Sequence, residues 1–235
     1  MPNWVFNTLS MEGDKEEIKK VVEALASPYK ALRDPNKFGE ETTLPFEETV
    51  VTPEGGISFM NCIAPSDIVG YYCMYRNLDG TPKDNQAVNL NQLSVTQQIL
   101  TNQIAPSEQE VLAGHDWYNW NVANWGTKWD VCNAYSEGDG EYQFDTAWSP
   151  PIEAITHLSR KFPEIEFTLN FQEEQGWGGE SLFQGGQETK IKDYDIPESH
   201  KEEVENTGEC RHCVEETDSD YWYDDCPKKM ELQEA

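Results

Sequence analysis

Apolar residues recur with two different periods along residues 1–186, and the two periods predict both strands and helices. Apolar and polar positions alternate strictly in residues 165–171, which is the strongest strand signal in the chain. Further strands are predicted at residues 4–11, 56–63, 128–135 and 142–148, and a short edge strand at Val50 and Val51. Apolar spacings of three and four residues predict amphipathic helices at residues 14–26 and 150–161.

The order of these elements predicts the fold class. Strand, helix, strand, followed by strand, helix, strand, is the split βαβ plan of an α+β, ferredoxin-like fold, in which helices cover one face of an antiparallel sheet. Asp14 and Ser149 are expected to cap the two helices, with Pro150 at the first helical position of the second. A glycine-rich hairpin at residues 176–186 is expected to end this domain.

Two stretches interrupt this plan. Residues 64–114 are predicted to be a helical insertion, with helices at residues 94–104 and 107–113. The following stretch, residues 114–151, holds five of the eight tryptophans. Such a cluster predicts a core, because burying one tryptophan removes roughly 150–250 Å² from water. A short helix is expected around Trp117 and Trp120, and Lys128 is expected to make a cation–π contact with a neighbouring tryptophan.

Three sequence motifs in this region are similar to those of a known family. They are Met1–Trp4, the pair Asp116–Tyr118 and Asn124–Asp130, and Thr146–Pro151. In this order they resemble the Api92-like (YubB-like) family of phages and conjugative plasmids, over roughly residues 1–186. The resemblance implies a ferredoxin-like domain and a mobile-element setting, and it implies no catalytic residue. Val5 stands where the family has a cysteine, so no role of that cysteine carries over.

The composition limits the kinds of partner that the protein can bind. With 44 acidic and 17 basic residues, the net charge is −27. Direct binding to nucleic acid is not expected, because such binding depends on basic side chains that displace counterions. The same charge attracts basic surfaces, which suggests mimicry of nucleic acid toward a DNA- or RNA-binding protein. The alternative, which the charge alone favours, is a plain acidic surface that keeps the protein solvated. No run of 18 apolar residues is present, so we expect no membrane span and a cytoplasmic location, in the host cell if a phage encodes the chain.

A cysteine cluster marks residues 187–235 as a separate, acidic C-terminal appendage. This segment holds 16 acidic and 6 basic residues. Cys210 and Cys213 form a C-x-x-C pair, and Cys226 follows. Such a pair presents two thiolates to one metal ion, and tetrahedral zinc needs four ligands. His200, in a predicted capped helix, is the favoured fourth ligand over His212, and the remaining candidates are Cys62, Cys73, Cys132, Asp224 and Asp225.

We therefore predict a small zinc knuckle formed by His200, Cys210, Cys213 and Cys226. A structural metal would explain how so polar a segment folds. The alternatives are a mobile tail with reduced cysteines and, less favoured, a redox C-x-x-C pair. Cys62, Cys73 and Cys132 lie on apolar elements and are better explained as buried small side chains.

The remaining motifs give no catalytic site. The sequence has no nucleophile elbow, phosphate loop or H-E-x-x-H motif, and the carboxylate pairs carry little information in so acidic a chain. The aromatic run Tyr221–Tyr223 (Tyr221, Trp222 and Tyr223) is a candidate anchor for a partner. The leading hypothesis is a non-enzymatic binding protein that contacts a basic, nucleic-acid-binding host protein, as a counter-defence inhibitor or nucleic-acid mimic. The alternatives are a metal-dependent enzyme acting on nucleotides and a virion or assembly protein.

Overall fold

The computed structural model describes most of the predicted domain and part of the appendage. The described residues are 3–35, 44–72, 78–79, 81, 117–138, 140–208, 210, 213, 223 and 225–227. The helices predicted at residues 94–104 and 107–113, together with Cys73, His212, Tyr221, Trp222 and Asp224, lie outside this part of the chain.

Within the described part, a sheet of six strands in the order β4-β5-β1-β6-β7-β8 is the centre of the fold. Every neighbouring pair in this sheet is antiparallel. The strands are β1 (Trp4–Glu12), β4 (Cys132–Gly138), β5 (Glu141–Ala147), β6 (Glu166–Glu173), β7 (Gly178–Gln184) and β8 (Gln187–Tyr194). The strands predicted at residues 4–11, 142–148 and 165–171 are therefore confirmed as β1, β5 and β6.

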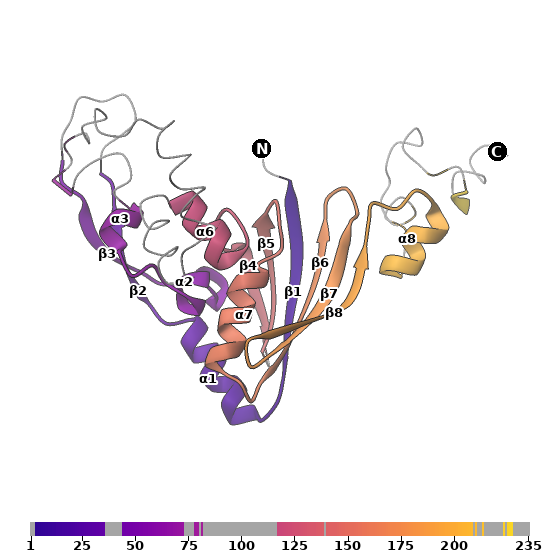
Figure 1. Cartoon of the computed structure of the whole chain (residues 1–235), viewed down its shortest axis with the longest axis horizontal. Helices are drawn as coiled ribbons and strands as arrows, with labels where there is room; N and C mark the ends of the chain where they lie inside the picture. The colour runs from indigo at the N-terminus through magenta and orange to yellow at the C-terminus, as the bar shows by residue number, and fades with distance from the viewer. Residues whose placement is uncertain are drawn as a thin grey trace, which may run out of the picture.

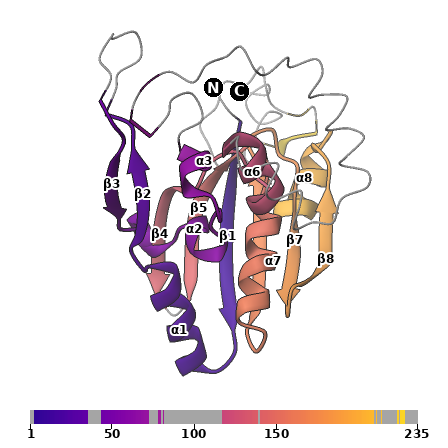
Figure 2. The ribbon, with the colours of Figure 1, turned by 60° about the vertical axis from the view of Figure 1, so that its left-hand side comes forward.

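Helices cover one face of the sheet, as Figures 1 and 2 show. Chain order β1–α1–β4–β5–α7–β6, with β1 between β5 and β6, is the split βαβ arrangement, so the ferredoxin-like fold class is confirmed. The helices on this face are α1 (Lys15–Leu25), α2 (Phe59–Cys62), α6 (Trp117–Trp125) and α7 (Ile152–Lys161). A separate two-stranded sheet, β2 (Tyr29–Arg33) with β3 (Glu47–Val51), and the short helix α3 (Ile68–Tyr72) lie beside them.

The core lies between the sheet and these helices. Leu9 of β1, Phe167 of β6 and Ile155 of α7 are fully buried, in line with the predicted apolar faces. Trp120 and Trp125 of α6 pack edge to face, with ring centroids 5.5 Å apart, and both are buried in the same cluster. The tryptophan-rich stretch therefore does build part of the core, and the short helix predicted within it is α6.

The predicted strand at residues 56–63 is wrong, because this segment forms the short 3₁₀ helix η1 (Glu54–Gly56) and helix α2. The Asp130 carboxylate accepts hydrogen bonds from the Ser58 hydroxyl at 2.5 Å and from the Phe59 backbone N–H at 2.7 Å. Ser58 also accepts from the Met60 N–H and caps the helix. These bonds fix the first turn of α2, and the second strand of the split βαβ plan is instead β4.

Two smaller expectations at the tryptophan-rich stretch also need correction. The predicted strand at residues 128–135 begins only at Cys132. Pro151, rather than Ser149, occupies the N-cap of α7, and the Ser149 hydroxyl donates to the Gly126 carbonyl at 2.6 Å. The predicted cation–π contact is present, with the Lys128 ammonium 4.6 Å from the Trp129 ring centroid and 4.3 Å from that of Trp148.

The six-stranded sheet continues past residue 186, where the sequence placed the end of the domain. Residues 176–186, predicted to be a hairpin, contain the single strand β7, which pairs with β6 on one side and with β8 (Gln187–Tyr194) on the other. Only after Tyr194 does the chain leave the sheet and reach α8 (His200–Thr207), which lies beyond β8 on the side away from the other helices (Figure 1).

We expect Gly55→Ala to lower the free energy of unfolding by about 2–4 kcal/mol. Gly55 has φ of +66°, and a Cβ atom there would lie 2.1 Å from the Ala134 carbonyl oxygen of β4. The cost combines left-handed backbone strain with overpacking. Urea denaturation measures it. Gly138→Ala is the matched control, because Gly138 also has a positive φ but a Cβ there meets no atom within 4 Å. Equal losses for the two variants would contradict the predicted clash.

Candidate metal centre

The candidate metal centre begins at the first turn of α8. Ser199 is its N-cap, and its hydroxyl accepts a hydrogen bond from the Glu202 N–H at 3.2 Å. The Asp225 carboxylate accepts from the backbone N–H groups of His200 at 2.8 Å and Lys201 at 3.3 Å. These bonds lower the pKa of Asp225 below its usual range, the His200 N–H having the largest effect. Asp225 therefore ties the C-terminal loop to the helix that carries His200.

The C-x-x-C pair forms a tight turn beneath this helix. The Cys213 N–H donates to the Cys210 carbonyl at 2.9 Å, which brings the two side chains to the same side of the turn. The Cys226 N–H donates in the same way to the Tyr223 carbonyl at 3.1 Å. Two short local turns and one helix terminus thus supply all the candidate ligands.

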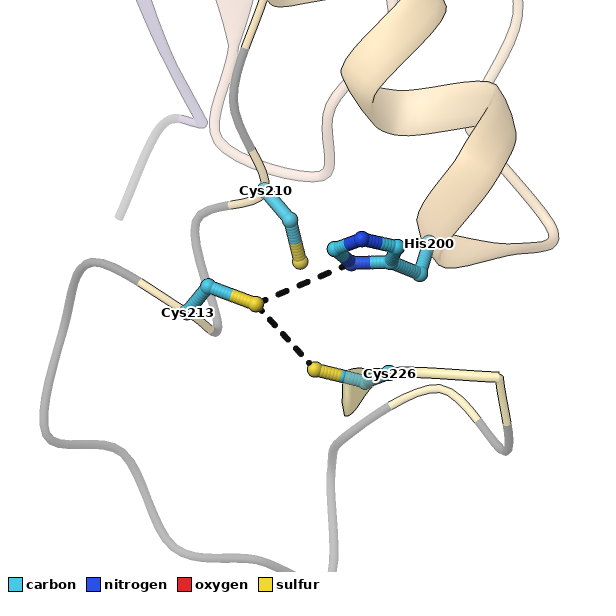
Figure 3. Close-up of side chains that lie close together, drawn as sticks. All are labelled: His200, Cys210, Cys213 and Cys226. Atoms are coloured by element: carbon cyan, nitrogen blue, oxygen red, sulfur yellow. Dashed lines mark hydrogen bonds between the residues drawn. The ribbon is translucent and has the colours of Figure 1, made fainter. Parts of the chain in front are cut away.

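The side chains of His200, Cys210, Cys213 and Cys226 point toward one another, as Figure 3 shows. One possible ligand atom from each lies within 4.8 Å of all the others. The Cys213 sulfur is 3.2 Å from the Cys226 sulfur and 3.7 Å from Nδ1 of His200. The structure therefore brings together the four residues that the sequence selected, and this group can hold a metal ion.

Two of the four side chains in the cluster are shielded from solvent, and His200 and Cys213 are half-buried. Cys226 is fully buried and Cys210 is 2% exposed, and Val204 and Tyr223 pack against them. The appendage has little other buried apolar surface in its described residues. A core that consists mainly of cysteine sulfur atoms is typical of a small unit that a metal ion holds together.

The other candidate ligands are placed elsewhere. Cys62 is fully buried in the main core, and burial raises its thiol pKa to about 12, so it stays protonated at neutral pH. Cys132 lies in β4 and is likewise shifted upward in pKa by burial. Asp225 caps α8. The interpretation of Cys62 as a buried small side chain is confirmed.

Sequence reasoning missed the capping role of Asp225, because no local pattern connects it to a helix 25 residues earlier.

Lys192 of β8 connects α8 to the sheet. Its ammonium donates hydrogen bonds to the carbonyl oxygens of Glu205, at 3.3 Å, and Asn206 in the last turn of α8. The carbonyl groups at a helix C-terminus have no partner within the helix, and a cation placed there also interacts favourably with the helix dipole. Lys192 thus holds the C-terminal end of α8 against the edge of the sheet.

We expect Lys192→Met to loosen α8 from the sheet while leaving the fold intact. A cation at a helix C-terminus contributes about 0.3–2 kcal/mol, so hydrogen exchange of the α8 amides should accelerate about 2- to 30-fold. Hydrogen–deuterium exchange mass spectrometry measures this. Lys190→Met is the matched control, since among the described residues the ion pair of Lys190 is with Asp193, three residues along the same strand. Identical exchange in the two variants would show that Lys192 does not anchor α8.

Comparison with known proteins agrees with the fold. Residues 124–213, from the end of α6 to Cys213, match the family model described as a ferredoxin-like domain in Api92-like protein. A crystal structure of a protein Api92 from Yersinia pseudotuberculosis is similar at 13% identity and a TM-score of 0.32, over 84% of this chain and 99% of that one. No curated protein matches the chain. Among the described residues, no helix is long and apolar enough to cross a bilayer. Residues 124–213 are thus similar to the ferredoxin-like domain of Api92-like proteins, the family that the motifs Asn124–Asp130 and Thr146–Pro151 within this range resemble.

Proposed function

We propose that the protein is a non-enzymatic binding protein whose C-terminal appendage is folded around one structural zinc ion. The observation that carries the proposal is the convergence of one histidine and three cysteines in one cluster, in which Cys210 and Cys226 are buried and His200 and Cys213 are half-buried. Thiolate and imidazole ligands in this number suit Zn²⁺, whose Cys₃His sites are structural and tetrahedral.

The spacing of the ligand atoms supports tetrahedral coordination. With Zn–S bonds of about 2.3 Å, ligand atoms at the corners of a tetrahedron lie about 3.8 Å apart. The separations of 3.2 Å and 3.7 Å around the Cys213 sulfur are close to this value. The four protein ligands fill the tetrahedron. A catalytic zinc keeps one position open for water or substrate, so this ligand set disfavours the metal-dependent enzyme as the alternative.

The charge of the chain supports a basic protein as the partner. A net charge of −27 repels nucleic acid and attracts basic surfaces, and this long-range attraction accelerates association at low salt. The appendage alone carries 16 acidic residues. Together with the mobile-element setting of the Api92-like family, this favours a nucleic-acid-binding host protein as the target, bound in the host cytoplasm. Tyr223, half-buried against the cysteine cluster, belongs to the proposed aromatic anchor at residues 221–223.

Metal content and cobalt substitution test the structural site. The purified chain should hold one zinc per molecule, and the Co²⁺ form should show the intense visible bands of a tetrahedral thiolate complex. Because the proposed site is closed, added azide or cyanide should leave that spectrum unchanged. A six-coordinate spectrum, or a spectrum that changes with azide, would show an open position and would revive the enzymatic alternative.

A capture experiment with the full chain tests the partner. Immobilised protein should retain from bacterial lysate one stoichiometric protein with an isoelectric point above about 9, and elution should follow the salt concentration. An unrelated protein of similar net charge is the control for non-specific attraction. Retention of the same proteins by that control, or binding that is insensitive to salt, would contradict the proposal.

A further inference from the structure

The face of the sheet opposite the helices presents an unusual central residue. Along β1, Val5, Leu9 and Met11 are buried on the helix-covered side, whereas Phe6 belongs to the opposite side. Phe6 is 52% exposed, although β1 has a neighbouring strand on each edge. Single exposed apolar residues are common on protein surfaces, so the exposure alone indicates nothing. The residues around Phe6 decide whether it belongs to a binding site.

Phe6 lies in a hollow of about 540 Å³. The strands β1, β4, β5, β6, β7 and β8 form its floor, and Asn206 and Thr207, at the C-terminal end of α8, form one wall. The volume is in the range of about 300–1,000 Å³ that small-molecule sites occupy. Tyr135, which is 50% exposed, and Tyr194 add further aromatic surface at the outer strands.

Two amide side chains beside Phe6 are available for a ligand. The register of β1 and β6 places Gln172 opposite Phe6 and Asn170 opposite Thr8. On the other side of β1, the Asp145 side chain of β5 accepts a hydrogen bond from Asn133. The Gln143 amide of β5 accepts a hydrogen bond from Tyr135 and donates one to Glu137. In the part of the chain that the structure describes, the side chains of Asn170 and Gln172 make no hydrogen bond. Both line the hollow beside the aromatic ring.

The hollow is nearly neutral in a strongly acidic chain. Its charged lining residues are Asp145, Glu180 and Lys192, and the ammonium of Lys192 is occupied by the carbonyl groups of α8. Recognition of phosphate needs free cationic groups or helix N-termini, and the hollow contains the C-terminal end of a helix instead. The lining therefore favours a flat, uncharged ligand whose edge carries both donors and acceptors.

We propose that this hollow binds the base of an uncharged nucleoside. The base stacks on the Phe6 ring, and the amides of Asn170 and Gln172 bond its edge. Aromatic side chains stack with any base, and asparagine and glutamine amides form paired hydrogen bonds with base edges, most often those of adenine. This proposal does not depend on the proposed basic partner. The acidic surface of the chain repels a nucleic-acid backbone, but it does not repel a neutral nucleoside.

Titration of the ¹⁵N-labelled full chain, as purified, with adenosine, guanosine, cytidine and uridine, followed by nuclear magnetic resonance, tests the proposal. We expect at least one nucleoside to shift the side-chain amide signals of Asn170 and Gln172. Phe6→Leu keeps an apolar side chain without a π face and should weaken binding about 5- to 150-fold, whereas Phe6→Trp should retain it. Val50→Ala removes an exposed apolar side chain outside the hollow, and it should bind as the wild type does.

Any of four results would overturn the proposal. The first is the absence of shifts with all four nucleosides. The second is wild-type affinity in Phe6→Leu. The third is equal binding of ribose or methyl glucoside, which would make the hollow a sugar site. Tighter binding of adenosine monophosphate than of adenosine would also count against a site for neutral ligands. None of these results bears on metal content or on capture of a basic protein, so the proposed function stands or fails separately.

Discussion

Replacing Cys226 by serine is expected to abolish tight zinc binding and to unfold the appendage, while the six-stranded sheet stays folded. Cys226 is fully buried, and it is the proposed ligand that follows Asp225 in the sequence. Loss of an outer-shell partner weakens metal binding about 10- to 100-fold, so loss of a direct thiolate ligand should exceed 100-fold. Because binding of structural zinc is coupled to folding, α8 should lose its protection with the metal.

Two measurements on the same sample check this prediction. Competition with a chromophoric chelator gives the zinc affinity, and hydrogen exchange compares the α8 amides with those of β1 and β6. The control is Cys62→Ala, which removes a buried thiol from the main core and should retain one zinc. Wild-type zinc affinity in Cys226→Ser, or loss of zinc in Cys62→Ala, would show that the cluster is not the metal site.

The second large effect is expected for Asp130→Ala, which should lower the free energy of unfolding by about 2–4 kcal/mol. The Asp130 carboxylate accepts from the Ser58 hydroxyl, the Phe59 N–H and, at 2.9 Å, the Val131 N–H. Each buried donor left without an acceptor costs about 1–3 kcal/mol. Part of this cost is offset, because burial of the carboxylate is itself unfavourable and raises the pKa of Asp130.

Urea denaturation of two further variants isolates the role of these bonds. Asp130→Asn keeps the shape of the side chain and one acceptor oxygen, so its loss should be intermediate. Asp145→Ala removes a carboxylate that accepts one exposed bond from Asn133 and should cost less than about 1 kcal/mol. A change within about 0.5 kcal/mol for Asp130→Ala would mean that the first turn of α2 does not depend on this residue.

Asp130 also shows why part of the fold was not predictable. In residues 56–63 the apolar positions Ile57 and Phe59 fit an alternating strand, and the sequence between them contains nothing that excludes it. The deciding contact comes from a carboxylate 71 residues further along from Phe59. By contrast, α1, α7, β1 and β6 carry long periodic patterns, and their buried faces were predicted because one face of each meets the core.

Strand β8 was missed for the opposite reason. Seven of its eight residues are exposed, so the strand has no buried face that would impose an alternating pattern. Its place in the sheet is set mainly by backbone pairing with β7. The four residues of the cysteine and histidine cluster were easier to predict, since the C-x-x-C spacing is a local signal and His200 is carried at the start of a capped helix. The hollow around Phe6 was not predicted, because its lining depends on the order in which six strands lie side by side in the sheet.

The central position of β1 has a consequence for how the chain folds during synthesis. This strand leaves the ribosome well before its partners, which are residues 142–147 of β5 and residues 166–173 of β6. Both edges of β1 are therefore open until residue 147 has been made, and the edge that pairs with β6 stays open until residue 173 has been made. Open strand edges favour pairing with other chains. Contacts this distant in sequence also slow folding. We expect newly synthesised chains to depend on chaperones until β6 emerges and closes the sheet around β1.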